Sequence, residues 1–200
     1  MPEPDRASVS RDLEAWLHGD GDKTLGALID VFGKRSFALV FVLLMGVPAL
    51  PLPTGGATHV FEVITVLLAL ELIAGREEIW LPERWRRREL ATEGRFVTGL
   101  LKVIRFLERF SRPRLTPAFG HRLSNVGFGL VVAAGSIAAF VAPPFSGLDT
   151  LPALGVVLVS LGVLLEDFVL VAVGLAAGAA GVVLELAVGK ALFDWAKGLL

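Results

Sequence analysis

The sequence predicts an all-α integral membrane protein of about five transmembrane or half-spanning helices, arranged as two repeated broken hairpins with an additional interfacial amphipathic helix. Hydrophobic residues make up 54% of the 200 residues, and the mean hydropathy is +0.68. A soluble domain of this length needs less apolar surface and carries more charge. The charged residues are concentrated in segments 1–35 and 76–125, and the rest of the chain is largely apolar.

The second observation is an internal repeat at a constant offset of 91 residues. Segment 37–77 aligns with segment 128–168 without a gap. Each copy is an apolar run, a Pro/Gly break and a second apolar run that ends at charged residues. Duplicated hairpins with matching breaks are typical of membrane proteins built from repeats, many of them transporters. The identical pairs are Phe37/Phe128, Leu39/Leu130, Val40/Val131, Pro53/Pro144, Gly56/Gly147, Val66/Val157, Leu67/Leu158 and Leu70/Leu161.

The chain begins with a polar helical cap, residues 1–35. We expect Ser10 to cap a first short helix that stops at Gly19, and Thr24 to cap a second that ends at Gly33. No basic segment followed by an uninterrupted apolar stretch occurs in the first 36 residues, so we expect no cleaved signal peptide.

The two hairpins occupy residues 36–77 and 126–168 and contain four apolar segments of 14–17 residues. At 1.5 Å per residue such segments cover about 21–25 Å, less than the ~30 Å hydrocarbon core. Each is therefore a short span, a locally thinned span or half of a re-entrant hairpin. The segments are Phe37–Leu50, Val60–Ala74, Val126–Ala142 and Leu151–Leu165.

The C-terminal helix, in residues 169–200, is the one full-length transmembrane candidate, because the apolar run Phe168–Gly189 is interrupted only by Glu185. Gly174, Gly178 and Gly181 lie on nearly the same face of this helix. Such a strip lets another helix approach closely, so we expect a homodimer or larger assembly through these glycines.

The connector, residues 78–125, is rich in arginine, which places it and the N-terminus in the cytoplasm of a multi-pass inner-membrane protein. Residues 96–110 are amphipathic and should lie in the membrane interface. This orientation makes the repeats parallel copies, although an inverted pair stays open. The apolar face holds Phe96, Leu100, Val103, Ile104, Leu107 and Phe110, and the opposite face Thr98, Lys102, Arg105 and Arg109.

The paired Pro/Gly breaks are the candidate substrate site. Backbone groups freed at membrane depth must meet protein, water or a solute, although ordinary wetted turns are an equal alternative. A carboxylate inside a span costs about 2.5 kcal/mol or more unless it faces a cavity or a partner, so a glutamate could exchange a proton there. Glu71 could instead reach the interface. The candidate residues are Pro53, Thr54, Gly55, Gly56, Pro144, Ser146 and Gly147, with Glu62 or Glu71 as the titratable member.

Other functional classes lack support in the sequence. The three histidines are scattered, no cysteine is present, and no nucleophile elbow, zinc motif or phosphate-binding loop occurs. We therefore expect no enzyme activity, no cofactor and no metal site. The net charge of −1 argues against a nucleic-acid partner, and positive-inside charge accounts for the arginines of the connector.

Three stretches of the chain resemble the ExoD family of bacterial exopolysaccharide-synthesis proteins. They are GDKTLG with the proline-rich break before Gly55–Gly56, the segment WLPERWRRR, and the run GVVLVSLGVLLEDF. The resemblance spans nearly the whole chain from about Leu17, with departures at Val63–Ile64 and Glu71. It implies a small inner-membrane protein tied to exopolysaccharide production.

Three hypotheses follow from these patterns. The first is a small transporter whose solute passes near the paired breaks. The second is a non-transporting scaffold subunit, which docks exopolysaccharide machinery through the basic connector and the amphipathic helix. The third, an enzyme acting on lipid-linked sugar, has the least support. Solute movement in liposomes would separate the first from the second.

Overall fold

The computed structural model describes residues 8–51, 56, 58–89, 95–110, 122–143 and 146–197, and within them the chain is helical without a β-strand. One isolated antiparallel bridge joins Thr24 and Glu89. The all-α prediction is therefore confirmed. In chain order the elements are α1 Val9–His18, α2 Leu25–Phe32, the short 3-10 helix η1 Gly33–Arg35, α3 Ser36–Met45, α4 His59–Ile73, α5 Glu83–Arg86, α6 Arg95–Phe110, α7 Arg122–Val141, α8 Thr150–Leu164 and α9 Phe168–Lys197.

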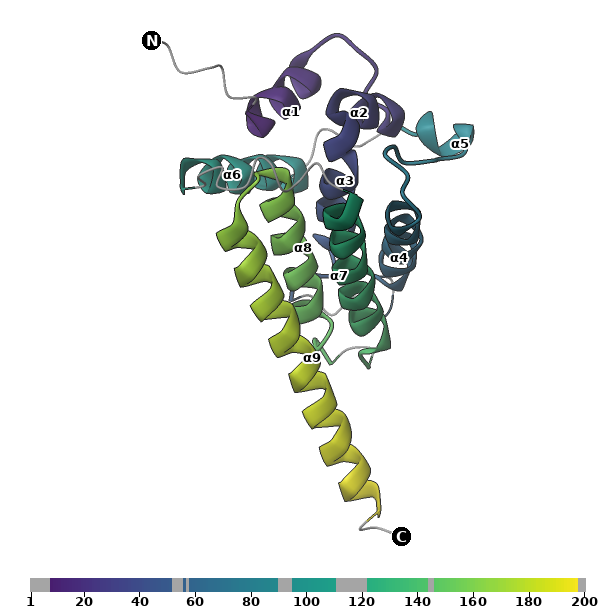
Figure 1. Ribbon diagram of the computed structural model, residues 1–200, viewed down its shortest axis with the longest axis vertical. Coiled ribbons are helices and arrows are strands. Elements are labelled where there is room, and N and C mark those ends of the chain that lie inside the picture. The colour runs from purple at the N-terminus through teal and green to yellow at the C-terminus, as the bar shows by residue number, and fades with distance from the viewer. Residues whose placement is uncertain are drawn as a thin grey trace.

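Four helices form the body of the molecule. α3, α4, α7 and α8 run side by side, α1 and α2 sit over one end, and α9 packs along α8 and continues past the other end (Figure 1). α3 packs mainly on α8 and α4 mainly on α7, so the helices of the first hairpin pack on helices of the second. A buried apolar core that includes Phe37, Phe41, Met45 and Val156 joins them.

Two described helices are long and apolar enough to cross a membrane, Arg122–Val141 and the Phe168–Ala191 part of α9. α7 is therefore longer than the span expected at Val126–Ala142, because it begins at Arg122, before the apolar run. Ser36–Met45 and Thr150–Leu164 are apolar but shorter, in agreement with the short spans that the sequence predicts.

The caps of the first two helices differ in how well the sequence predicts them. Thr24 caps α2 by accepting a hydrogen bond from the Ala27 backbone N–H, and the helix ends at Gly33, both as predicted. The cap of α1 is Ser8, not Ser10. The helix starts earlier because the Glu108 carboxylate of α6 accepts the Ser10 backbone N–H at 3.0 Å, and a negative charge is favourable at a helix N-terminus.

The glycine strip of α9 is covered by α8. A Cβ added at Gly174 would lie 2.5 Å from the Val159 nitrogen, and one at Gly181 would lie 2.5 Å from Pro152 Cδ. The close approach that these glycines permit is thus made within one chain. We expected these glycines to contact a second copy of the chain, but they contact α8 of the same chain. A homodimer itself stays a prediction.

α6 lies across the end of the helical body rather than along it (Figure 1). Among the described side chains of α6, Ile104 is the buried one, and Leu101 and Leu107 pack in the same cluster as Val9 and Leu13 of α1. Val103 is 46% exposed and Phe106 is 62% exposed. Two residues of the predicted membrane-facing side, Ile104 and Leu107, thus pack on protein instead. The side chains of Phe96, Leu100 and Phe110 lie outside the part that the structure describes.

Several features recur at the offset of 91 residues. α4 and α8 begin and end at corresponding positions. Gly56 and Gly147 both have positive φ, 86° and 68°. Gly75 has φ 90°, and its counterpart Glu166 is the one described residue other than glycine with positive φ, 55°. The hydroxyl of Ser136 contacts the sulfur of its own counterpart, Met45, at 3.7 Å.

Candidate functional site

A buried carboxylate lies near the end of the body that faces away from α1 and α2. Glu62 in the first turn of α4 has 0% of its side chain exposed. Its Oε2 is 2.6 Å from Nδ1 of His59, three residues earlier on the same helix face. Oε1 is buried and meets no hydrogen-bond partner among the described residues. The ring of His59 packs against Phe140 of α7, with 4.9 Å between ring centroids.

The physical significance of this pair is the energy that burial requires. A carboxylate withdrawn from water is unstable unless it is paired, and one free oxygen leaves it only half satisfied. His59 supplies one partner and exposes 28% of its side chain. It therefore links the buried Glu62 with the outside of the bundle.

Small hydroxyls are also buried between the helices. Thr65 of α4, Ser136 of α7 and Ser160 of α8 each have 0% exposure. Thr65 donates to the Phe61 carbonyl at 2.8 Å, whereas the Ser160 hydroxyl meets no partner in the described part of the chain. Together with Glu62 they make the interior of the bundle more polar than the apolar helices suggest.

The predicted break residues are only partly visible. Pro53, Thr54, Gly55 and Pro144 lie outside the described residues. Ser146 is exposed, donates to the Pro143 carbonyl at 2.6 Å and accepts the Leu148 backbone N–H, so its hydroxyl closes a turn. Gly147 is exposed as well, whereas Gly56 approaches His59, since a Cβ there would lie 3.5 Å from the imidazole Cδ2.

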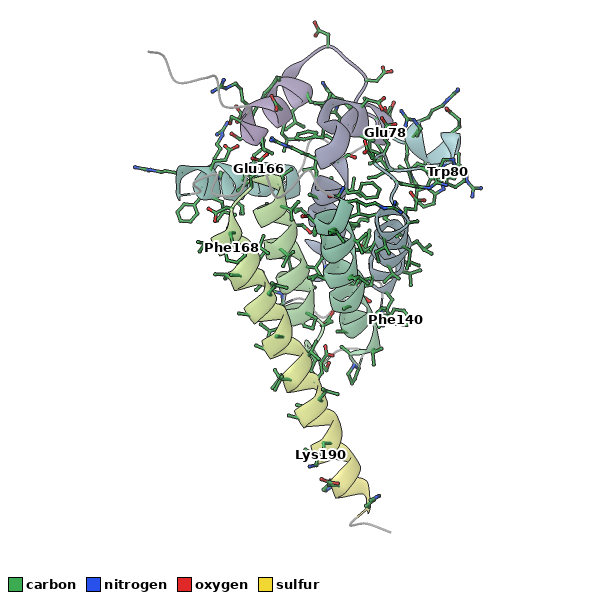
Figure 2. The ribbon with its side chains drawn as sticks, viewed as in Figure 1. Glu78, Trp80, Phe140, Glu166, Phe168 and Lys190 are labelled. Carbon is green, nitrogen blue, oxygen red and sulfur yellow. The ribbon has the colours of Figure 1, made fainter. Side chains whose placement is uncertain are left out.

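The two candidate glutamates of α4 have different surroundings. Glu71 is partly exposed and accepts the Trp80 backbone N–H at 3.1 Å. Nine residues of helix, about 13.5 Å, separate it from Glu62. Of the two, the structure brings only Glu62 into the interior. Glu71 is partly exposed and contacts the backbone of the exposed Trp80, which Figure 2 labels.

A cavity of about 140 Å³ lies at the other end of the body, where Figure 2 labels Glu166. The guanidinium of Arg35 donates to the Glu166 carboxylate at 2.6 Å, and these side chains are 39% and 20% exposed. The lining includes two pairs of residues that are 91 positions apart, and helices of both hairpins contribute to it. Its residues are Arg35, Phe37, Ala38, Leu72, Asn125, Phe128, Val163 and Glu166.

Sequence reasoning missed this cavity. The sequence suggests that Glu166 is a solvated acid at a helix end, and its partner Arg35 is 131 residues away in the chain. The signal that could have found it is the alignment of the repeats, because Glu166 stands where the first copy has Gly75. Within the described residues no three His, Asp or Glu side chains are grouped as a metal site would need.

Comparisons with known proteins identify the family of this chain. The model of the family described as "Exopolysaccharide synthesis, ExoD" matches residues 9–187. Protein ExoD of Rhizobium meliloti is 32% identical over 180 residues, which cover 88% of this chain and 74% of that protein. An uncharacterised protein of Synechocystis is 29% identical over 176 residues, covering 84% of this chain and 81% of the relative. No solved structure matches.

The family match covers nearly all of the described helices, from α1 into α9. Together with the two helices long and apolar enough to cross a membrane, it indicates a membrane protein. By its family model and its curated relative alike, the chain belongs to the ExoD family of exopolysaccharide synthesis.

Proposed function

We propose that this protein is a multi-pass inner-membrane transporter of exopolysaccharide synthesis that moves a small solute between its two hairpins, with Glu62 and His59 carrying the coupled proton. The observation that carries the proposal is the fully buried carboxylate of Glu62, with one oxygen unpartnered among the described residues. Ionisable groups held inside a membrane bundle mark solute paths and proton relays.

The mechanism follows from the pair itself. When Glu62 takes up a proton, the carboxyl becomes neutral and its burial costs less. His59, partly exposed, is the group that can pass this proton between water and Glu62, because its Nδ1 already contacts Oε2 at 2.6 Å. The buried hydroxyls of Thr65, Ser136 and Ser160 offer a passing solute hydrogen bonds inside the bundle.

The arrangement of the hairpins supports a repeat-built transporter. α3 and α7 run in one direction and α4 and α8 in the other, and each hairpin mates with its counterpart (Figure 1). Equivalent positions that meet, such as Met45 and Ser136, are expected beside a pseudo-two-fold axis. We infer that this axis runs along the helices, so that the copies are parallel and the solute path follows it.

Charge orients the protein in this proposal. α1, α2, α5 and α6 gather at one end of the body (Figure 1), and the arginines of the connector favour a cytoplasmic position for that end. α6 then lies in the cytoplasmic interface, and its exposed Val103 and Phe106 contact lipid.

A scaffold that docks exopolysaccharide machinery is the second candidate function, and the same charged end favours it. Arg86 of α5 is partly exposed there, and its Nη2 donates to both carboxylate oxygens of Asp30 of α2, at 2.8 and 2.9 Å, which links α5 to α2. A charged surface outside the bundle is the kind of surface that a partner protein can recognise.

The test compares two isosteric substitutions on one helix. Glu62→Gln should lower exopolysaccharide output severalfold at unchanged protein abundance and should stop proton uptake into liposomes that contain the purified protein and an imposed negative potential. Glu71→Gln should leave both near wild type, because Glu71 lies at the surface. Normal output and proton uptake with Glu62→Gln would reject the transporter. Loss of output with Arg86→Gln alone would then favour the scaffold.

A further inference from the structure

The cavity at the Arg35–Glu166 pair has a composition that the repeat does not explain. Its apolar walls are duplicated, since Phe37 is equivalent to Phe128 and Leu72 to Val163. Its charged groups are not, because Arg35 corresponds to Val126 and Glu166 to Gly75. The polar chemistry is therefore particular to this cavity.

Glu166 adopts a backbone conformation that is costly for its residue type. Its φ of 55° lies in the left-handed region, which glycine occupies freely and which Gly75 occupies in the first copy. Other residues are uncommon there, and such positions cluster where a side chain has a functional role. At this position the carboxylate of Glu166 accepts a hydrogen bond from the guanidinium of Arg35.

The charges of the lining select a class of ligand. Arg35 repels a cation and Glu166 repels an anion, and at 2.6 Å the two charges nearly cancel. A guanidinium carries five N–H donors and a carboxylate about four acceptor positions, so one contact between them leaves capacity for a ligand that both donates and accepts. Asn125 adds an amide with the same dual character.

The apolar part of the lining selects shape and size. Phe37 and Ala38 are 2% exposed and form the inner wall, whereas the ion pair lies nearer the surface. A space of about 140 Å³ corresponds to four or five water molecules at about 30 Å³ each, so it takes at most one ring and excludes an oligosaccharide.

We infer that this cavity binds a neutral polyhydroxylated molecule of about one sugar ring. Hydroxyls of the ligand accept from Arg35 and Asn125 and donate to Glu166, while its C–H faces contact Phe37 and Phe128. The inference does not depend on proton transfer at Glu62, which lies at the opposite end of α4.

The experiment measures equilibrium binding of three radiolabelled hexoses to the full-length protein in nanodiscs. Glucose, glucuronate and glucosamine share one ring and differ in charge. Glucose should bind at least tenfold more tightly than either charged sugar. Glu166→Gln should shift the preference towards glucuronate, and Arg35→Gln should shift it towards glucosamine, since each variant leaves one charge unopposed.

Two further variants separate binding from folding. Glu166→Gly removes the carboxylate at a position where glycine suits the backbone, so it should weaken glucose binding at least tenfold with a thermal unfolding midpoint close to wild type. Glu83→Gln, which removes the exposed pair with Arg87, should change neither property. Absence of saturable glucose binding, or a charge preference that Glu166→Gln and Arg35→Gln leave unaltered, would overturn the inference.

Discussion

At the scale of single residues, Glu62 and Glu166 show why chemistry is harder to predict than hydropathy. Glu62 was expected as one of two titratable candidates, and its choice over Glu71 depends on the helix face that meets α7, which one sequence does not reveal. Glu166 was not a candidate, because its partner Arg35 comes close only when α3 packs on α8. Contacts between distant segments, not local pattern, decide both.

Backbone conformation gives the first residue-scale prediction. Gly75→Ala should destabilise the protein by about 1–2 kcal/mol, because a φ of 90° puts a Cβ against the backbone. The matched change Gly189→Ala, inside α9 with nothing within 4 Å of the added Cβ, should be neutral or stabilising by about 0.5–1 kcal/mol. Thermal unfolding in one detergent compares the two, and equal effects would show that the Gly75 conformation is not required.

At the scale of elements, helices and caps that rest on local sequence were predictable. Thr24 and Gly33 bound α2 as expected because both signals act within one turn. The start of α1 was wrong by two residues, since Glu108 of α6 takes part in it. The packing of α6 against α1 was not predicted for a similar reason, because it joins Ile104 with Val9 and Leu13 of a distant segment.

The contact between α8 and α9 gives a prediction at this scale. Gly174→Ala should destabilise the protein by about 1–3 kcal/mol, since its Cβ would lie 2.5 Å from the Val159 nitrogen. Gly178→Ala, one turn further along the same strip, should be tolerated because its Cβ would meet Gly155 at 3.7 Å. Unfolding measurements test this. A Gly174→Ala protein of normal stability that loses only self-association would contradict the packing described here.

The exposed side of α6 gives a second prediction for an element. Cysteine placed at Phe106 should react with a bilayer-soluble maleimide faster than with a membrane-impermeant one, because an interfacial helix turns its exposed apolar residues to lipid. The chain has no native cysteine, so the label reports one position. Cysteine at the exposed Glu83 of α5 is the aqueous control. Equal labelling of both positions would place α6 in water.

At the scale of the whole molecule, the all-α class and the family were predictable from composition and motifs, because both depend on the chain as a whole. The packing of helices of one hairpin on helices of the other was not predictable. Aligning the two segments shows which residues correspond, but it does not show which helices are in contact. The structure also separates the ends of the chain, with α1 at one end of the body and the last turns of α9, near Lys190, at the other (Figure 2).

The separation of the ends predicts the topology. A reporter that is active only in the periplasm should work when fused after Leu200 and fail when fused before Met1, if α1 lies on the cytoplasmic side and α9 crosses the membrane. A fusion in the basic connector should fail as well. Activity at both termini would require an even number of crossings and would exclude this arrangement.

The packing of helices from one hairpin on helices of the other has a consequence for synthesis of the chain. α4 leaves the ribosome well before its main partner α7. The last residues of the two helices, Ile73 and Val141, are 68 positions apart, which at about 5–20 residues per second corresponds to a wait of about 3–14 s. During that wait Glu62 lacks α7, the helix on which α4 mainly packs, and lipid offers no hydrogen bond to its carboxylate. His59 lies only three residues away on the same helix, so this pair can form as soon as α4 does. By pairing with the Glu62 carboxylate, His59 would thus first lower the cost of holding the nascent hairpin in the membrane.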